Sequence, residues 1–338
     1  MEQFFYWSTA GGIRDSGAAL AGRFALVSSQ RRSRQRLEGR TRLQEVMSMR
    51  AGIIGAGKVG FSLGKYLVER GIPVTGYYSR NPVSAKEASD FTATGFFENL
   101  ADIVKDSDTL FITVPDGVIG DVWDDMGDLT VKGKNICHCS GSVSSAVFFD
   151  AEERGACRYS IHPLYAVSDR YTSWKDLGKA HFTIEGSRVH LQEMADAFRS
   201  LGNRVTIMAD PEKKAIYHAA AVMVSNQMAA LADVGVQLLT TCGFTREDAE
   251  KALAPLITGN ALKIGQVGSV EALTGPIERG DAQTVRNHLA AMEEENLTEI
   301  REIYEGLSKV LVEMAEKKHP ERDYRSLKEI LKGNEEQK

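Results

Sequence analysis

The sequence predicts an α/β fold in which a doubly wound parallel sheet is followed by an all-helical C-terminal domain. Between residues 51 and 209, short apolar strands alternate with helices, which is typical of a parallel sheet covered on both faces. A glycine-rich turn at residues 55–60 separates the first strand from the first helix. After Asp210 the strand pattern stops, and long stretches with an apolar residue every three or four positions replace it.

The elements of the sheet domain follow from the spacing of its apolar residues. Residues 109–114 form a continuous apolar run, which indicates a strand buried on both faces. The other strands are expected at residues 51–54, 72–78, 92–96, 135–139, 159–161, 181–184 and 205–207. Helices are expected after the glycine-rich turn and at residues 81–91, 100–105, 117–126 and 189–201.

The second domain should consist of long helices. They are expected at residues 211–239, 245–266 and 282–318, and the last of these carries an apolar stripe on a charged helix. Within it, Asn296-x-x-Glu299 has the pattern that caps a helix start, which predicts a second helix inside this stretch.

The glycine-rich turn has the spacing of a dinucleotide-binding site. Gly55 permits the tight turn, Gly57 leaves space for a pyrophosphate, and Gly60 lets the helix approach the strand. The first turn of the helix, with Lys58 and Val59, offers free N–H groups and the positive end of the helix dipole to phosphates. We therefore expect a Rossmann-like domain; the alternative is a glycine-rich turn that binds nothing.

The end of the second strand indicates which dinucleotide is bound. An acidic residue there would bind the ribose hydroxyls of NAD, but this chain has Ser79, Arg80 and Asn81. Arg80 can pair with a 2′-phosphate, and its two neighbours can donate hydrogen bonds to it. The sequence therefore favours NADP(H), unless Arg80 is simply a solvated loop residue.

Composition argues against nucleic acid and membranes as partners. The formal net charge is −5, and 43% of the residues are hydrophobic, as in ordinary globular proteins. The uncharged stretch 215–232 is about as long as the ~18 residues a membrane helix needs. It contains His218, Ser225, Asn226 and Gln227, so a helix buried in protein fits better. This stretch leads us to expect a homodimer.

The cysteines indicate a reducing compartment. Cys137 and Cys139 lie on an expected buried strand, and none of the four cysteines has the spacing of a metal site. We interpret them as small core residues of a cytoplasmic protein, and we expect no bound metal.

The N-terminal residues differ from the rest of the chain. Residues 1–50 contain nine arginines, no lysine and four acidic residues, without a continuous apolar segment of the secretory type. We expect this leader to be disordered, or translation to start later, at Met47 or Met49. The alternative is an organellar transit peptide. The domain organisation is then a leader at 1–49, an NADP-binding domain at 50–209, a helical substrate and dimerisation domain at 210–320 and a tail at 321–338.

Polar residues follow several strands of the predicted sheet. Ligands of doubly wound folds bind beyond these carboxyl ends. Val114 and Pro115 are expected to line the cofactor, and Ser140 with Gly141 would let the backbone approach the nicotinamide. Asp116 belongs to the same group, but it could instead cap the helix expected at Gly117.

Two further groups are candidates for catalysis. His162, which follows another strand, could supply the proton that accompanies hydride transfer, or it could fix the loop before Pro163. Lys214, Ser225 and Asn226 lie on or beside one face of the helix that opens the second domain, and they could polarise a substrate carbonyl. The alternative is a surface lysine beside a core His218.

The loop at residues 272–281 is the third candidate. Glycine and proline punctuate it, and Asp281 can cap the next helix. Arg279 could bind a substrate carboxylate beside Thr274, or the segment could be a plain connector between helices.

These motifs occur in the same order in a bacterial family of NADP oxidoreductases, which the chain resembles over about residues 50–320. They are Gly55-x-Gly57-x-x-Gly60, Val114-Pro115-Asp116, Ser140-Gly141, His162-Pro163-Leu164, Ala219-Ala220-Ala221 with Ser225-Asn226, and Leu273-Thr274-Gly275-Pro276-Ile277-x-Arg279-Gly280-Asp281. The resemblance implies a Rossmann-like domain followed by a helical domain of unknown function, and the substrate of that family is not established.

More distantly, the arrangement is similar to that of pyrroline-5-carboxylate reductase, 6-phosphogluconate and β-hydroxyacid dehydrogenases, ketopantoate reductase and prephenate dehydrogenase. The chain lacks the Ser-Pro-Gly-Gly-Thr-Thr loop of the first, which argues against proline synthesis. Its His162-Pro163 pair is similar to the His-Pro pair of prephenate dehydrogenases, which implies a catalytic His162.

Together these features predict an NADP(H)-dependent oxidoreductase. It would transfer hydride between nicotinamide and a small, anionic carbonyl or imine compound. Two other functions are compatible with the sequence: an NADPH-binding sensor or scaffold without turnover, and a prephenate-like dehydrogenase, which Arg80 disfavours. Coenzyme F420 as the redox partner also fits the sequence.

Overall fold

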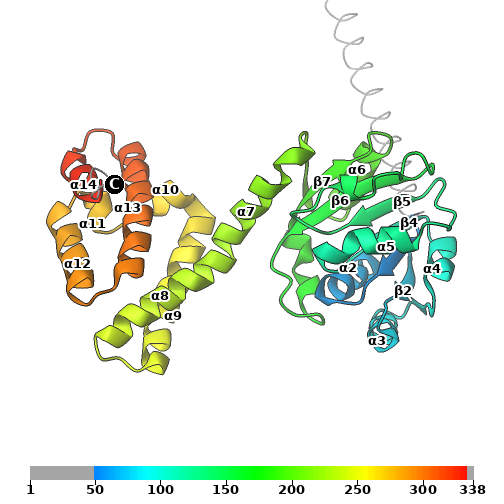
Figure 1. Cartoon of the computed structure of the whole chain (residues 1–338), viewed down its shortest axis with the longest axis horizontal. Coiled ribbons are helices and arrows are strands. Elements are labelled where there is room, and N and C mark those ends of the chain that lie inside the picture. The colour runs from blue at the N-terminus through cyan, green and yellow to red at the C-terminus, as the bar shows by residue number, and fades with distance from the viewer. Residues whose placement is uncertain (1–48, 333–338) are drawn as a thin grey trace, which may run out of the picture. The chain divides into compact units, whose positions relative to one another are not determined.

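The computed structural model describes residues 49–332, which form two compact units divided between Val222 and Met223 (Figure 1). Residues 1–48 of the predicted leader and the end of the predicted tail, residues 333–338, lie outside the described part. The division falls inside the helical stretch predicted to open the second domain. Its first turns belong to the first unit because they contact strands there.

Within the described residues, the first unit contains an eight-stranded sheet in the order β3-β2-β1-β4-β5-β6-β7-β8. Neighbouring strands at its centre run parallel, which confirms the predicted Rossmann-like architecture. The strands are β1 (Ala51–Ile54), β2 (Val74–Tyr78), β3 (Gly95–Phe96), β4 (Thr109–Ile112), β5 (Asn135–His138), β6 (Cys157–Leu164), β7 (His181–Gly186) and β8 (Arg204–Ile207).

One pairing corrects the prediction of a wholly parallel sheet. Strands β6 and β7 run antiparallel, with His162 opposite Thr183. The connection between them holds only the short 3-10 turns η3 (Ser173–Lys175) and η4 (Leu177–Lys179). A parallel return usually runs through an α-helix that crosses the sheet, and residues 165–180 form none, so the next strand pairs antiparallel.

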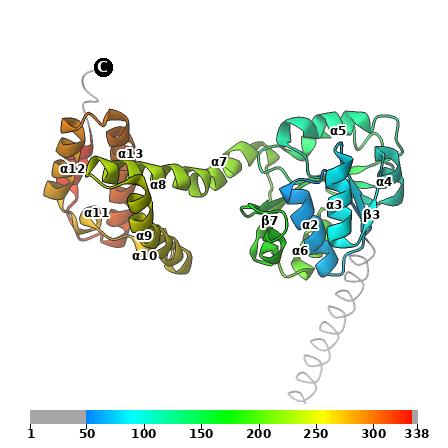
Figure 2. The ribbon, with the colours of Figure 1, turned by 90° about the horizontal axis from the view of Figure 1, so that it is seen from below.

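Helices cover both faces of the sheet and form two separate cores (Figure 2). One face buries Phe61 of α2, Ala85 of α3 and Phe198 of α6, and the other buries Ile103 of α4 and Trp123 of α5. Side chains that alternate along each strand supply both cores. The helices are α2 (Lys58–Glu69), α3 (Pro82–Thr92), α4 (Leu100–Asp106), α5 (Ile119–Asp125) and α6 (Leu191–Ser200).

Helices and loops make up the described part of the second unit, as predicted. Its core joins α11, α12, α13 and α14 through buried side chains such as Ile277, Val285 and Val312. The division between the units falls near the end of α7. The helical elements after β8 are η5 (Pro211–Lys213), α7 (Lys214–Val224), α8 (Asn226–Thr241), α9 (Arg246–Val267), α10 (Ser269–Ala272), α11 (Pro276–Arg279), α12 (Ala282–Glu294), α13 (Thr298–Lys318) and α14 (Arg325–Leu331).

Several helix boundaries differ from the sequence predictions. The stretch 282–318 does divide into two helices, but Asn296 is not the cap: it has φ 58°, and Leu297 takes the N-cap position. The segment treated as a tail contains α14, because Leu327 and Leu331 bury their side chains in the second core.

By length and composition, the helical stretch Pro211–Thr241 could cross a membrane, since an 18-residue window within it has a mean hydropathy of 1.3. Its first part includes the buried Lys214, and its second part includes Asp233, whose carboxylate lies 2.5 Å from Arg246. The uncharged residues 215–232 lie between these two charged side chains, and only 6% of the apolar window is buried in the described part of the chain. The prediction of a helix buried in protein is therefore wrong for the described residues.

Candidate functional site

Steric contacts within the described chain require two of the three glycines in the glycine-rich turn, and the third borders open space. Gly55 has φ +104°, and a Cβ there would lie 2.9 Å from Val114 Cγ1. A Cβ on Gly60 would lie 2.2 Å from the Gly55 carbonyl oxygen, so this glycine allows α2 to approach the strand. A Cβ on Gly57 would meet no atom of the described chain within 4 Å, so its backbone borders open space.

A cavity of about 320 Å³ opens beside this turn, at the carboxyl ends of β1, β2 and β4. Its lining includes the following predicted cofactor residues: Gly55, Gly57, Ser79, Arg80, Val114 and Pro115. The remaining predicted cofactor residues, which are Lys58, Val59, Gly60, Asn81, Asp116, Ser140 and Gly141, are not part of the lining. The position of the cavity fits the adenosine and pyrophosphate part of a dinucleotide.

Two residues near this cavity hold local structure instead of facing it. Asn81 caps α3, and its side-chain oxygen accepts a hydrogen bond from the Val83 N–H at 3.1 Å. Asp116 is not the cap of a helix at Gly117, because Pro115 takes that position. The Asp116 carboxylate instead accepts a hydrogen bond from the Ser142 hydroxyl at 2.6 Å, which joins the loops after β4 and β5.

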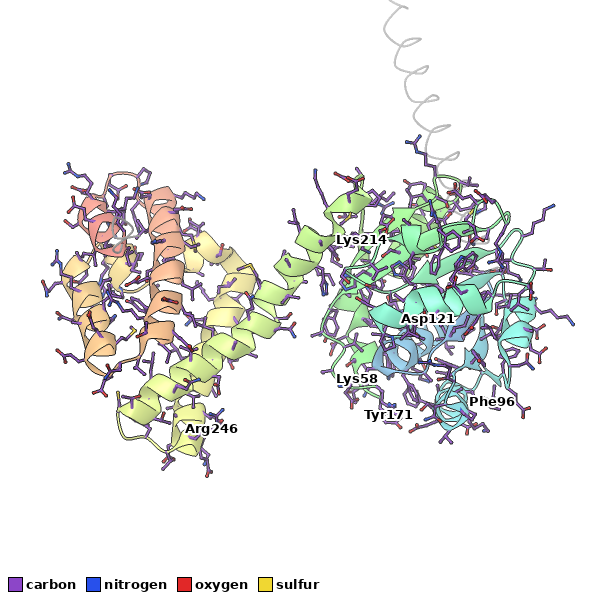
Figure 3. The ribbon with its side chains drawn as sticks, viewed as in Figure 1. Lys58, Phe96, Asp121, Tyr171, Lys214 and Arg246 are labelled. Carbon is purple, nitrogen blue, oxygen red and sulfur yellow. The ribbon has the colours of Figure 1, made fainter. Side chains whose placement is uncertain are left out.

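Sequence reasoning missed part of the lining. Asp121 and Asp125 from α5, Ser84 from α3 and Arg170 from the β6–β7 connection also face the cavity. Asp121 is labelled on α5 in Figure 3. The spacing of Ser84, four residues after Arg80, could have indicated the helical contribution, whereas nothing local marks Arg170.

Two imidazole rings converge on Gly141, beyond the end of β5. A Cβ on Gly141 would lie 2.6 Å from His218 Nδ1 and 2.9 Å from His162 Nε2, so only glycine fits beneath these rings. The Tyr217 hydroxyl lies 2.7 Å from His162 Nδ1. Buried His218 Nδ1 has no hydrogen-bond partner among the described residues, which leaves one polar atom available to a ligand.

His162 is neutral at neutral pH. Burial lowers the pKa of its imidazole to about 4, with the nearby Lys214 charge acting in the same direction. The expected role as a proton donor assumed an ordinary histidine pKa near neutral pH, and the burial of this ring corrects that expectation.

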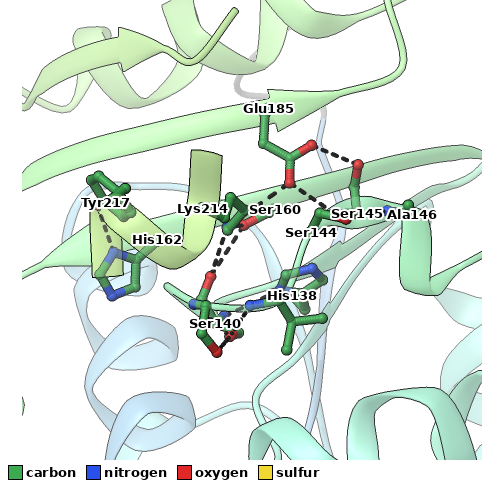
Figure 4. A network of polar contacts seen from close by, with 12 residues as sticks. His138, Ser140, Ser144, Ser145, Ala146, Ser160, His162, Glu185, Lys214 and Tyr217 are labelled. Carbon is green, nitrogen blue, oxygen red and sulfur yellow. Dashed lines mark hydrogen bonds and ion pairs between the residues drawn. The ribbon is translucent and has the colours of Figure 1, made fainter. Parts of the chain in front are cut away.

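Lys214 is buried, with 3% of its surface exposed, so the alternative of a surface lysine is wrong. Its ammonium donates hydrogen bonds to the Ser140 carbonyl at 2.9 Å and to the Ser160 hydroxyl (Figure 4). Burial lowers the pKa of Lys214 to about 8, while the carboxylate of Glu185, 3.8 Å away, opposes this shift. Lys214 therefore fixes the loop after β5 by its hydrogen bond to the Ser140 carbonyl.

Two other buried groups complete this network (Figure 4). The carboxylate of Glu185 accepts hydrogen bonds from the Ser145 N–H at 2.8 Å and from its hydroxyl at 2.7 Å. His138 Nδ1 accepts from the Ser140 N–H at 3.2 Å, and burial lowers the pKa of His138 to about 3. The backbone around Ser140 is thus fixed on both sides. Glu185, Ser160 and Tyr217 were missed because their contacts join distant segments.

The remaining predicted residues lie in the second unit. Ser225 separates α7 from α8, and its hydroxyl donates to the side-chain oxygen of Asn226 at 3.0 Å. Arg279 ends the short helix α11 and is exposed. Asp281 caps α12 as predicted, accepting from the Thr284 N–H at 3.0 Å.

Comparison with known families identifies both domains. Residues 31–163 match the model of a Rossmann-like domain, and residues 180–311 match that of a domain of unknown function, DUF2520. The chain therefore combines a Rossmann-like domain with a DUF2520 domain, which confirms the arrangement that its motifs resemble. No curated protein matches this sequence closely enough to serve as a relative.

Solved structures share the fold over most of their length. Protein TM1727 from Thermotoga maritima is 26% identical, with a TM-score of 0.64, and the match covers 80% of this chain and 99% of that one. A reductive aminase from Aspergillus terreus, solved with NADPH and ethyl-5-oxohexanoate, is 15% identical, with a TM-score of 0.57 and coverages of 78% and 94%. A pyrroline-5-carboxylate reductase from Coxiella burnetii is 12% identical, with a TM-score of 0.52 and coverages of 80% and 98%.

Proposed function

We propose that this protein is an NADP(H)-dependent oxidoreductase that acts on a small, anionic carbonyl or imine compound. The observation that carries the proposal is the convergence of His162 and His218 on Gly141, which follows β5. The cavity beside the glycine-rich turn lies at the carboxyl ends of other parallel strands of the same sheet. The relatives in fold that are described as a reductive aminase and a pyrroline-5-carboxylate reductase support this reaction class.

The residues beside the turn fit a dinucleotide. The open space at Gly57 and the N-terminus of α2 would accept the pyrophosphate, and the exposed Arg80 with Ser79 would bind a 2′-phosphate. Val114 and Pro115 would line the bound cofactor where β4 ends. The bound nicotinamide supplies or accepts the hydride.

The proton would come from His162. We assign the Tyr217 hydroxyl as the donor to Nδ1, which would place the proton of the neutral imidazole on Nε2, the nitrogen nearer Gly141. Reduction of a C=O or C=N bond takes one hydride and one proton. A neutral ring can only hydrogen-bond the substrate heteroatom, so His162 would first take up a proton from solvent. The imidazolium would then donate this proton from Nε2 and return to the neutral ring. A substrate carboxylate beside the ring would raise the pKa of His162, and the buried Lys214 charge would also favour such an anion.

The test is oxidation of NADPH with a panel of keto acids and cyclic imines. Turnover by the wild-type protein, lost in His162→Ala and reduced in Tyr217→Phe while NADPH binding remains, would support the proposal. Unchanged turnover in His162→Ala would remove this residue from the chemistry. Tight NADPH binding without turnover on any compound would instead favour a sensor or scaffold.

We also propose that the protein is a homodimer. Large apolar side chains are exposed on two adjacent helices of the second unit, α8 and α9. They are Met228, Leu231, Leu256, Leu262, Ile264 and Val267. A second copy offers a matching apolar surface, and its burial would stabilise the assembly by roughly 25 cal/mol per Å².

The oligomer can be tested by light scattering. The wild-type protein should elute at twice the chain mass, and Leu262→Glu should shift it toward the monomer. The control is Phe149→Glu, because Phe149 is equally apolar and 70% exposed but lies in the first unit. A wild-type monomer at micromolar concentration would reject the dimer.

A further inference from the structure

The connection between β6 and β7 contributes an arginine to the cofactor cavity. Because β7 returns antiparallel, this connection is free to extend along the first turns of α2 instead of forming a crossover helix. Arg170 lines the cavity together with Gly57 and Arg80. The segment around Arg170 therefore reaches the same space as the glycine-rich turn and the end of β2.

The backbone at Arg170 is held in place from both sides. The Asp169 carboxylate accepts hydrogen bonds from the Tyr171 N–H at 2.9 Å and from the Thr172 N–H at 2.8 Å. The Ser62 hydroxyl of α2 donates to the Asp169 carbonyl at 3.4 Å. The Tyr171 ring, labelled in Figure 3, packs edge-on against Phe61, with ring centroids 5.6 Å apart. Arg170 thus projects from a fixed turn.

The guanidinium of Arg170 is oriented but incompletely enclosed. Its Cζ lies 4.6 Å from the centroid of the Phe61 ring, and Nη1 donates to Glu87 Oε2 at 2.8 Å. The side chains of Arg170 and Glu87 remain 32% and 41% exposed, so their ion pair is a weak one. Glu87 lies on α3, the helix that follows Arg80 and also places Ser84 in the cavity.

We propose that Arg170 is a second binding residue for the 2′-phosphate of NADP(H), and that the phosphate replaces Glu87 as its partner. This inference rests on the proposed function, because it requires the cavity to bind the dinucleotide. A phosphate monoester carries up to two negative charges and accepts bidentate hydrogen bonds from arginine, so it outcompetes one exposed carboxylate. The contact with α3 favours the 2′-phosphate over the pyrophosphate, which the turn at Gly57 would hold.

Fluorescence titration of the full chain with NADPH and NADH tests this role. Arg170→Ala should weaken NADPH binding by at least about tenfold and leave NADH binding within about twofold. Competition with adenosine 2′,5′-bisphosphate and with ADP should show the same contrast. Arg170→Lys should recover part of the loss, and Glu87→Gln should leave NADPH binding unchanged or tighter. Arg204→Ala is the matched control, since Arg204 is exposed on β8 at the edge of the sheet opposite β3.

Each outcome separates the two proposals. If the wild-type protein prefers NADPH and Arg170→Ala keeps the same preference, the role of Arg170 is overturned. The proposed function is then unaffected. Equal losses for NADPH and NADH in both Arg170 variants, with unchanged melting temperatures, overturn the assignment to the 2′-phosphate. A wild-type protein that binds neither dinucleotide overturns the proposed function, and this inference with it.

Discussion

The glycine-rich turn and the cluster around Lys214 belong to the same sheet, but the chain forms them in different ways. The turn works through backbone geometry, and its three glycines lie within six residues. The cluster works through side chains from β5, β6, β7 and α7, whose contacts span up to 74 residues. A backbone site can therefore be recognised from local spacing, whereas a side-chain site needs the tertiary fold.

The largest expected effect is a loss of stability that should occur when Gly60 of the turn is replaced but not when Gly57 is replaced. Gly60→Ala should destabilise the protein by about 3 kcal/mol, because its Cβ would lie 2.2 Å from the Gly55 carbonyl oxygen. Gly57→Ala meets no protein atom of the described chain within 4 Å, so it should change stability by less than about 0.5 kcal/mol. It should nevertheless weaken dinucleotide binding by about tenfold or more. Urea unfolding and NADPH titration measure both effects, and normal binding by Gly57→Ala would contradict a phosphate site here.

Removal of the buried cation should also have a large effect. Lys214→Met should destabilise the protein by roughly 2–4 kcal/mol, because it removes the cation beside buried Glu185 and a donor to the Ser140 carbonyl. Adding Glu185→Gln should recover part of the loss. Urea unfolding of the single and double variants tests this coupling. Additive losses would show that the two side chains act independently.

The 2′-phosphate assignment of Arg80 predicts a smaller, selective effect. Arg80→Ala should weaken NADPH binding by roughly tenfold to a hundredfold, because a charge-assisted pair is lost, and should leave NADH binding nearly unchanged. Titration of both dinucleotides measures the ratio of their affinities. Equal affinities for NADPH and NADH in the wild-type protein would contradict the NADP assignment.

The buried histidines predict the smallest effect, a dependence of stability on pH. The pKa of His162 is about 4 and that of His138 about 3 in the folded protein, both below the ordinary value of 6.5. The unfolded chain therefore binds more protons between pH 6.5 and these values, so stability is full above pH 6.5 and falls as the pH decreases toward 4.

The histidine contribution is isolated by comparison with a variant. Replacement by His162→Gln should reduce the stability lost between pH 7 and pH 4.5 by roughly 1–2 kcal/mol relative to the wild-type protein. Urea unfolding at the two pH values gives this difference. An identical loss in the variant and the wild-type protein would mean that His162 does not resist protonation in the fold.

The sequence by itself determined the elements whose physics is local. The apolar run at β4, the turn at Gly55 and the helical periodicity after Asp210 each depend on neighbouring residues, and the structure confirms them. Only one of three predicted helix caps is confirmed. Asp281 caps its helix, whereas Asn296 and Asp116 do not. Competing caps lie within one or two residues of each other, so tertiary contacts decide between them.

Only the tertiary structure decided the chemistry of the candidate site. The antiparallel return of β7 brings Arg170 to the cavity, and the fold buries Lys214 beneath the loop after β5. Burial also makes His162 neutral. The position of α7 against the sheet brings Tyr217 beside it. The charge state and hydrogen bonds of these groups depend on desolvation and on distant partners, and neither is encoded in the spacing of nearby residues.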